Sequence, residues 1–421
     1  MTPRQRLQAT LEHRPVDRLC VDLGAGGQTG IGVCALHRLR QAVLGDHRYV
    51  VKVHEPYQML GLVDEQLRQA LALDVMGIQS PYTMFGFKNE GWKPFVMPDG
   101  TPCLVPARFN VTRDRNGDYL MHPQGDLTCA PCARMPYDGY FFDSIPRQKP
   151  FREEELDPKD NLEEFAVLSD EEIRYYRQEV HQAYEQTDYG IYFTLPGTAF
   201  GDIALVPAPW LKDPRGIRDI EEWYVSIVSR PWYIKAVFEG QLEIALRNIE
   251  LLAKALADQV QVAFVSGTDF GTQQGTFCSV QTFRQLYKPY LKAVCDQIHR
   301  LTKWKVFVHS CGAIYPLIPE FIDAGVDILN PVQCSAAGMD PKRLKREFGR
   351  DLVFWGAGVD TQNTLPFGTP DEVYREVRQR IEVFFEDGTG YVFSPIHNIL
   401  SNVPVENILA MFKAVNDARG L

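Results

Sequence analysis

Short β-type runs alternate with longer amphipathic stretches along most of this chain, and this alternation constrains the fold more than any other feature. Runs rich in Val, Ile and aromatic residues indicate strands, whereas apolar residues three or four positions apart indicate helices. We expect eight strands, at residues 18–23, 73–78, 191–194, 260–265, 305–308, 327–329, 352–355 and 391–393. We expect helices at residues 34–43, 169–186, 231–257, 280–301, 315–322, 341–348, 371–385 and 404–418. Such alternation is typical of a parallel sheet.

The number and order of the strands favour a (β/α)8 TIM barrel of the α/β class over an open, doubly wound sheet. The dinucleotide-binding fingerprint of the open sheet is incomplete. The Gly-rich turn at residues 24–29 lacks the third glycine in register, and no acidic residue follows a second strand at the usual distance. We therefore expect residues 1–421 to form a single barrel domain.

The alternation breaks between residues 81 and 160. This stretch is rich in Pro, Gly, Asp and aromatic residues, and Asp99-Gly100 and Asn116-Gly117 are hairpin turn signals. We expect residues 81–160 to form a β-rich insertion after the second strand. Its aromatic residues would form either a wall of the functional pocket or a dimer surface, and they are Tyr82, Phe85, Phe87 and Trp92.

Composition narrows the classes of partner. Lys and Arg number 44 against 54 Asp and Glu, which gives a net charge of -10 without a long block of either sign. This disfavours nucleic acid and anionic membranes as partners and favours a small-molecule substrate. No signal-peptide pattern and no run of about 18 apolar residues is present, so a cytoplasmic protein is expected. The nine cysteines are irregularly placed, which indicates reduced thiols or metal ligands rather than disulfides.

Two metal-type motifs follow late strands. His309-Ser310-Cys311-Gly312 comes directly after the strand at 305–308, and His397 follows the strand at 391–393. In a barrel, the carboxyl ends of all strands meet at one mouth, where the loops carry the chemistry. Catalytic zinc sites use three N or S ligands and keep one position open. We predict that His309, Cys311 and His397 bind a metal ion, with Cys334 as a reserve ligand. The alternative is that they are ordinary polar residues at strand ends.

Other polar residues fall in the same predicted loops. Asp269 and Asp360 are candidates for a catalytic role, as a general base or as an acceptor that orients a metal-bound histidine. The alternative for each carboxylate is an ordinary loop cap. The candidates for substrate binding are Gln273, Gln274, Asn330 and Gln333.

These motifs resemble the uroporphyrinogen decarboxylase-like superfamily, and most closely its zinc-dependent methylcobamide:thiol methyltransferase branch. His309-Ser310-Cys311-Gly312 is similar to the His-x-Cys-Gly zinc motif of that branch, and Ser394-Pro395-Ile396-His397 to its late Ser-Pro-Gly-Cys segment. Residues 14–18 and 404–408 extend the resemblance. It implies a TIM barrel, bound Zn2+, a homodimer, and transfer of a methyl group from a methylcorrinoid to a thiol. Because this chain has no Asp-x-His-x-x-Gly motif, a partner protein would have to supply the corrinoid.

The chain departs from the family pattern in two places. His397 stands where the methyltransferases have a third cysteine ligand, which removes one negative charge and makes the zinc a stronger Lewis acid. Bound hydroxide is then favoured, and the acceptor need not be the usual thiol. The Met-Arg-Gln-Ala-Gly-Arg-Tyr element of the true decarboxylases is replaced by residues 22–27. Without its arginines a polycarboxylated tetrapyrrole has no clamp, so uroporphyrinogen decarboxylation is not expected.

The sequence therefore predicts a zinc-dependent methyl- or alkyltransferase. The second hypothesis is a zinc-hydroxide lyase or hydrolase, or a decarboxylase, that acts on a small carboxylated substrate. The third is a barrel that binds a metal or a small molecule without catalysis.

Overall fold

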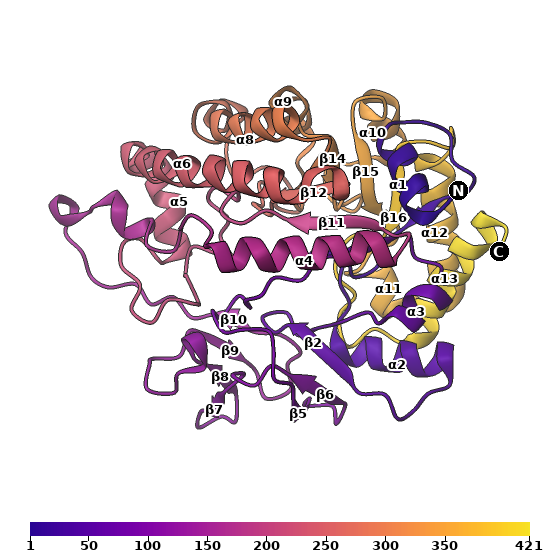
Figure 1. Ribbon diagram of the computed structural model, residues 1–421, viewed down its shortest axis with the longest axis horizontal. Helices are drawn as coiled ribbons and strands as arrows, with labels where there is room; N and C mark the ends of the chain where they lie inside the picture. Colours follow the sequence, from indigo (N-terminus) through magenta and orange to yellow (C-terminus); the bar gives the residue numbers. More distant parts are fainter.

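The computed structural model describes residues 1–421 and contains an eight-stranded sheet in the order β1-β16-β15-β14-β13-β12-β11-β4 (Figure 1). Every neighbouring pair in it is parallel. The strands are β1 (Cys20–Val21), β4 (Val75–Gly77), β11 (Gly190–Thr194), β12 (Val262–Ser266), β13 (Lys305–His309), β14 (Ile328–Asn330), β15 (Val353–Ala357) and β16 (Tyr391–Ser394). The predicted TIM barrel is confirmed, and each predicted strand corresponds to one barrel strand.

The sheet closes at Asp74, between the two edge strands β1 and β4. The Asp74 backbone N–H donates to the carbonyl of Val21 at 2.9 Å, and the Val21 N–H donates to Asp74 Oδ2 at 2.9 Å. The same fully buried carboxylate pairs with the buried guanidinium groups of Arg6 and Arg419. These contacts join the N-terminal helix, the first two barrel strands and the C-terminal helix at one point.

The barrel interior is a packed core of 13 buried residues. Its centre holds aromatic rings from three strands, with Phe307 at 5.3 Å from Tyr192 and 5.4 Å from Trp355 between ring centroids. Helix α1 (Pro3–Leu11) contributes Leu7 and Leu11 to this core, so it plugs one end of the barrel. A Cβ at Gly190 would lie 2.2 Å from a Leu7 methyl carbon, which shows how closely helix and strand pack.

Helices cover the outside of the barrel, and none of them is long and apolar enough to cross a membrane. Besides α1 they are α2 (Val33–Leu44), α3 (Glu65–Ala70), α4 (Asp170–Gln186), α5 (Ile220–Ser229), α6 (Pro231–Leu256), α7 (Val280–Thr282), α8 (Lys288–Leu301), α9 (Ile318–Ala324), α10 (Pro341–Phe348), α11 (Thr364–Phe367), α12 (Pro370–Phe384) and α13 (Val405–Arg419). Two helix predictions were imprecise. A π-helical turn, Phe283–Tyr287, interrupts the helix expected at 280–301, and a 3-10 turn, Tyr315–Leu317, begins the one expected at 315–322. Helices α1, α3, α5 and α11 were not predicted.

Two small antiparallel or mixed sheets lie beside the barrel, below α4 in the view of Figure 1. Six of their strands come between β4 and α4, as expected for a β-rich insertion after the second barrel strand. They are β5 (Lys93–Val96), β6 (Pro102–Val105), β7 (Val111–Arg113), β8 (Tyr119–Met121), β9 (Ala133–Met135) and β10 (Asp143–Ser144). The sequence did not predict β2 (Val51–Glu55) and β3 (Leu60–Gly61), which come before β4. Pairing of β2 with β6 joins the insertion to the β1–β4 connection.

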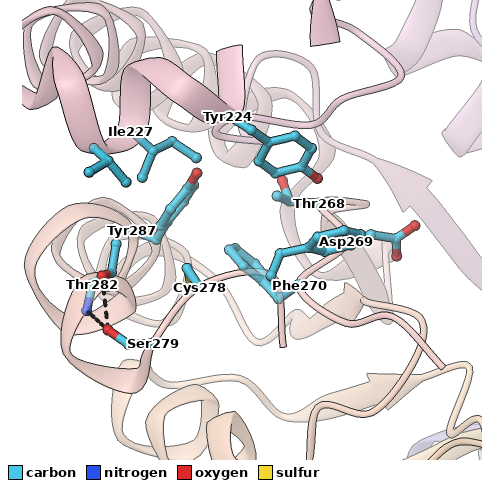
Figure 2. A pocket seen from close by; sticks show the side chains of 12 residues that line it. Tyr224, Ile227, Thr268, Asp269, Phe270, Cys278, Ser279, Thr282 and Tyr287 are labelled. Atoms are coloured by element: carbon cyan, nitrogen blue, oxygen red, sulfur yellow. Dashed lines mark hydrogen bonds between the residues drawn. The ribbon is translucent and has the colours of Figure 1, made fainter. Parts of the chain in front are cut away.

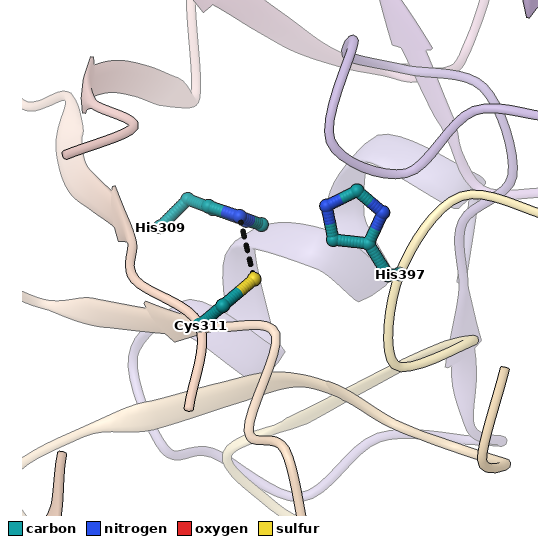
Figure 3. Close-up of side chains that lie close together, drawn as sticks. All are labelled: His309, Cys311 and His397. Carbon is teal, nitrogen blue, oxygen red and sulfur yellow. Dashed lines mark hydrogen bonds between the residues drawn. The ribbon is translucent and has the colours of Figure 1, made fainter. Parts of the chain in front are cut away.

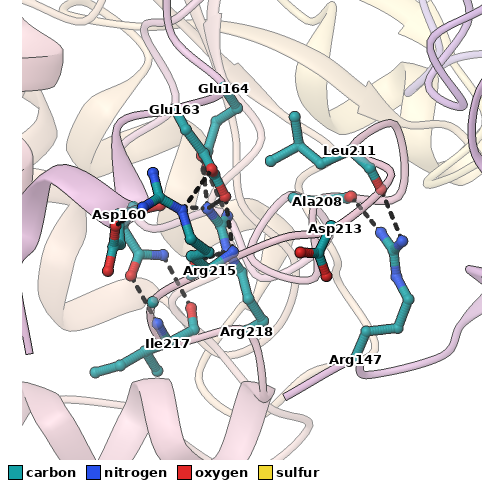
Figure 4. A network of polar contacts seen from close by, with 12 residues as sticks. Arg147, Asp160, Glu163, Glu164, Ala208, Leu211, Asp213, Arg215, Ile217 and Arg218 are labelled. Carbon is teal, nitrogen blue, oxygen red and sulfur yellow. Dashed lines mark hydrogen bonds and ion pairs between the residues drawn. The ribbon is translucent and has the colours of Figure 1, made fainter. Parts of the chain in front are cut away.

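A polar network fastens the chain that leaves the insertion to the long loop between β11 and α5 (Figure 4). Arg147 donates to the carbonyls of Ala208 and Leu211, each at 2.7 Å. Arg218, which is fully buried, pairs with Glu164 at 2.8 Å and donates to the carbonyl of Asp160. Both segments are thus held in one position relative to the barrel mouth.

The buried carboxylate at the barrel seam can be tested by substitution. Asp74→Asn leaves the buried guanidinium of Arg419 without a counter-charge and leaves Arg6 with Asp17 alone, and we expect the free energy of unfolding to fall by about 3–5 kcal/mol. The control is Asp17→Asn, which removes the other partner of Arg6, a carboxylate that is 40% exposed, at a cost of about 1 kcal/mol or less. Urea denaturation measures both variants. Equal losses would show that Asp74 has no special role in closing the barrel.

Candidate metal centre

The side chains of His309, Cys311 and His397 meet at the carboxyl ends of the barrel strands (Figure 3). His309 is the last residue of β13, Cys311 follows two positions later, and His397 lies in the loop after β16. One ligand atom from each residue lies within 4.8 Å of the other two, and Cys311 Sγ is 3.3 Å from His309 Nε2. Tetrahedral zinc with N and S ligands places those atoms about 3.5 Å apart, so small side-chain shifts complete such a site.

Asn330 fixes the orientation of the His309 ring. The two residues are register partners on β13 and β14, and Asn330 Oδ1 lies 2.5 Å from His309 Nδ1. The amide of Asn330 donates in turn to the carbonyl of Trp355 at 2.8 Å. The Nδ1–H group of His309 donates to Asn330, so Nε2 carries no proton and is directed toward Cys311. This is the usual arrangement around a metal-bound histidine.

Backbone conformation and close packing explain why glycine occupies position 312 of the His-x-Cys-Gly motif. Gly312 has a positive φ of 87°, and a Cβ there would lie 2.5 Å from the carbonyl oxygen of Thr272. The loops after β12 and β13 therefore touch through their backbones, and glycine is required at the contact. This contact holds Cys311 beside the loop that carries Asp269.

The pKa shifts of His397 and Cys311 have a direct bearing on metal binding. Burial and the nearby His309 lower the pKa of His397 to about 3, so its imidazole is neutral and can act as a ligand. Burial and the Asp269 carboxylate raise the pKa of the Cys311 thiol well above its ordinary value. A divalent cation reverses that shift, because it binds the thiolate and displaces the proton.

Asp269 lies directly against the cluster. Its Oδ1 accepts a hydrogen bond from the Cys311 N–H at 2.6 Å and is 3.9 Å from His309 Nε2. The Asp269 side chain is 32% exposed and faces the cavity beside the cluster. Asp269 does not orient the His309 ring, because Asn330 accepts from Nδ1 and Asp269 faces Nε2, so its role as a base stays a prediction.

The remaining predicted residues lie near the cluster but serve different purposes. Cys334 is outside the group of three, and its thiol donates to the carbonyl of Val332 at 3.3 Å. Asp360 accepts from the backbone N–H groups of Gln362 and Asn363, so it caps its own loop. Asn330 is fully buried and uses both ends of its amide on protein groups, which makes it a positioning residue for His309.

The three glutamines predicted to bind substrate lie in different positions relative to the cluster. Gln333 accepts from the Gly312 N–H at 2.9 Å, and it shares the side-chain oxygen of Gln362 with Gln273. Gln273 and Gln333 line a cleft beside Cys311. Gln274 is exposed and lines none of the three cavities around the cluster.

A cavity of about 720 Å³ opens between the barrel mouth and the insertion. His309, His397 and Asp269 form part of its floor, and the insertion supplies Phe141 and Phe142 to its wall. None of the four aromatic residues predicted for a pocket wall lines this cavity, so only a dimer surface stays a prediction for them. Its volume suits a small-molecule substrate.

Two smaller cavities adjoin the cluster. One, of about 440 Å³, is lined by Cys311, His397 and several amide side chains. The other, of about 490 Å³, lies behind Asp269 and is walled by Tyr224, Phe277 and Tyr287 (Figure 2). His397 lines both the large cavity and the 440 Å³ cleft, whereas His309 lines only the former and Cys311 only the latter. The cluster therefore lies between the large cavity and the 440 Å³ cleft.

Asp202 is a site residue that sequence reasoning missed. It lies in the loop between β11 and α5, lines the large cavity, and is close enough to Asp269 for the two charges to interact. Burial, reinforced by Asp269, raises the pKa of Asp202 to about 6. No strand end or motif precedes Asp202, so only the folded loop reveals it.

The fold and the cluster define a TIM-barrel protein with a candidate metal centre at the mouth of the barrel. Residues 208–418, about half of the chain, match the family model of uroporphyrinogen decarboxylase, and the chain belongs to this family. Among solved structures, a methyltransferase from Methanosarcina mazei is similar over 99% of both chains, with 15% identity and a TM-score of 0.53. At this identity the likeness shows the fold alone.

Other solved structures are more distant. An endoxylanase of family GH10, retrieved from a sugarcane soil metagenome, covers 42% of this chain and 68% of its own at 9% identity, with a TM-score of 0.29. No curated protein matches the chain in sequence.

The roles of ligand and orienting residue can be separated by metal titration. We expect His397→Ala to abolish stoichiometric binding of Co2+ or Zn2+, because it removes one of three ligands. Asn330→Ala leaves all three ligands but releases the His309 ring, and should weaken binding by about 10–100-fold. His181→Ala, on the exposed face of α4, is the control and should bind normally. Wild-type affinity in Asn330→Ala would contradict the orienting role.

Proposed function

We propose that this protein is a zinc-dependent methyltransferase that moves a methyl group from a corrinoid, carried by a separate protein, to a thiol. The observation that carries the proposal is the His309, Cys311 and His397 cluster at the barrel mouth of a uroporphyrinogen decarboxylase family member. The full-length structural likeness to a methyltransferase supports the same direction. Membership in a family of enzymes favours catalysis over simple metal binding.

The donor set fits zinc. Two imidazoles and one thiolate are ligands that zinc prefers, and three protein ligands leave a fourth position for a substrate. The second contact of His309, to Asn330, is the support that such sites require. Zinc held there would lower the pKa of a substrate thiol, so that thiolate is available at neutral pH.

The protein groups then have distinct tasks. Asn330 keeps His309 in position, and Asp269 faces the cavity, where it can accept the thiol proton and pass it to solvent. In the transfer the sulfur–carbon bond forms while the cobalt–carbon bond breaks, and the electron pair of the broken bond stays on cobalt. The residues of the chain supply position and proton acceptance, and they form no bond to the methyl group.

Two cavities meet at His397, and they support a transfer between two molecules because each reactant has its own route to the metal cluster. A displacement at carbon needs the acceptor and the leaving group on opposite faces of that carbon. The large cavity would admit the acceptor beside His309. The cleft beside Cys311 is lined by four amide side chains, which suit the amide-bearing rim of a corrin, and these are Gln273, Gln333, Gln362 and Asn398.

The second candidate is hydrolysis or elimination by zinc-bound hydroxide. His397 favours it, because an imidazole in place of a thiolate leaves the metal a stronger Lewis acid. Decarboxylation of a polycarboxylated tetrapyrrole is disfavoured, because no lysine or arginine lines any of the three cavities around the cluster.

The proposal is tested with free methylcobalamin as the methyl donor and 2-mercaptoethanol as the thiol. Zinc-loaded wild type should demethylate the corrinoid, which is followed by its absorption spectrum, and His309→Ala should be slower by about 100-fold or more, since it loses both a metal ligand and thiol activation. His181→Ala should match wild type. Inactivity of the zinc-loaded wild type, together with hydrolysis of an activated ester at the same centre, would overturn methyl transfer in favour of hydroxide chemistry.

A further inference from the structure

The large cavity beside the cluster contains acidic side chains and no basic one. Its charged lining consists of Asp143, Glu164, Asp202 and Asp269, apart from the two histidines of the cluster. The two smaller cavities also lack lysine and arginine. A ligand that enters therefore meets a negative potential, which disfavours carboxylates, sulfonates and phosphates and favours a cation.

The charges of two of these four carboxylates are already stabilised, one by an ion pair and the other by solvent. Glu164 is 6% exposed and pairs with the guanidinium of Arg218 through contacts of 2.8 and 2.9 Å (Figure 4). Asp143 is exposed on the insertion at the rim. The unbalanced negative charge inside the cavity therefore comes from Asp202 and Asp269.

Asp269 is committed to the metal cluster. Its Oδ1 accepts a hydrogen bond from the Cys311 N–H and lies 3.9 Å from His309 Nε2. A cation bound by the cluster would therefore neutralise the charge of Asp269 before that of Asp202. Asp202 is left without a partner of opposite charge. Its Oδ1 accepts the Ala204 N–H at 3.0 Å, while no hydrogen bond reaches Oδ2.

The space beside Asp202 Oδ2 is kept open by a glycine. A Cβ at Gly267 would lie 3.1 Å from this oxygen and 3.3 Å from Cζ of Phe264, and 4.0 Å from Nε2 of Gln28. Gly267 has no positive φ, so space and not backbone conformation accounts for the glycine. The gap is therefore bordered by a carboxylate, the group that attracts an ammonium ion, and by the tip of the Phe264 ring.

A half-buried carboxylate such as Asp202, close to a second one, is destabilised, and a cation in contact with it removes that cost. More aromatic side chains line the rest of the same cavity, and they are Tyr57, Phe141, Phe142, Phe165 and Trp210. Their rings offer apolar contact to any ligand and cation–π attraction to a positively charged one. Shape, charge and lining thus indicate one class of ligand.

We propose that the large cavity binds a substrate with an ammonium group, with Asp202 as its counter-ion in the gap at Gly267. The inference rests on the proposed function, since an acceptor bound in this way would present its thiol to the metal cluster in the same cavity. The acceptor is then an aminothiol and not a sulfonated or carboxylated thiol.

The test compares three thiols of equal chain length that differ in their terminal group: 2-aminoethanethiol, 2-mercaptoethanol and 2-mercaptoethanesulfonate. Binding to the Co2+-substituted protein is read from the thiolate-to-cobalt charge-transfer band, without any methyl donor. One charge-assisted contact corresponds to about a 10–100-fold change in affinity, so we expect the aminothiol to bind about 10-fold or more tightly than the alcohol, and the sulfonate to bind weakest.

Variants identify the counter-ion. Asp202→Asn should reduce the preference for the aminothiol over the alcohol to about twofold or less, as expected when a charge-assisted contact is lost. Gly267→Ala should weaken the aminothiol more than the alcohol, because it fills the gap. Asp138→Asn removes the same charge from an exposed site on the insertion, outside the cavity, and should keep the full preference.

The outcomes separate this inference from the proposed function. Tightest binding of the sulfonate, or an unchanged preference in Asp202→Asn, overturns the ammonium site even where methyl transfer occurs. Loss of Co2+ from Asp202→Asn also overturns it, since Asp202 would then serve the metal. Aminothiol preference that depends on Asp202, in a protein that leaves methylcobalamin intact, upholds the ammonium site and overturns the transferase.

To test the cation site without thiol chemistry, metal-free protein is titrated with 2-aminoethanol and with its uncharged isostere propan-1-ol in a calorimeter. The amine should bind at least about 10-fold more tightly, as expected for one ionic contact, and Asp202→Asn should remove the difference. Equal binding of the two ligands to wild type counts against the site.

Discussion

Closure of the sheet at Asp74 is the constraint on which the rest of the structure depends. His309 and His397 follow strands β13 and β16, which are three strand spacings apart in the sheet order. In a flat sheet that separation is about 14 Å. Only a closed barrel turns the strand ends toward a common axis, and there the ligand atoms lie within 4.8 Å of one another. The buried group of Asp74, Arg6 and Arg419 at the opposite end of the barrel thus helps to bring the three candidate ligands together at its mouth.

The parts of the fold and site that the sequence predicts are those with local signals. The barrel strands are buried on both faces and appear as continuous apolar runs, so all eight could be placed within a few residues. The ligands followed from their position after such runs and from the His-x-Cys-Gly spacing. The start of helix α1 also has a local signal in the sequence, because Thr2 and Gln5 form a capping box and Pro3 occupies the first helical position.

The parts that the sequence does not predict depend on long-range contacts. Strand β2 is defined by its pairing with β6, some fifty positions later, and nothing in its own residues specifies that partner. The sequence places Asn330 at a strand end. Its hydrogen bond to His309, however, depends on the register between β13 and β14. Asp202 lies in a loop without periodicity, and it matters only because the insertion and the β11–α5 loop enclose a cavity around it.

The balance of charge connects the departure at His397 with the acidic cavity. Zinc with two imidazoles and one thiolate keeps one positive charge, whereas a second thiolate would cancel it. In this chain a carboxylate, Asp269, lies against the cluster and restores that balance without being one of the three clustered ligands. A zinc ion held here would be less electrophilic than the three ligands alone would make it, which would keep the proposed thiolate chemistry accessible. The charge of Asp202 exceeds what this balance requires, and in the proposed ammonium site its counter-charge would arrive with the substrate.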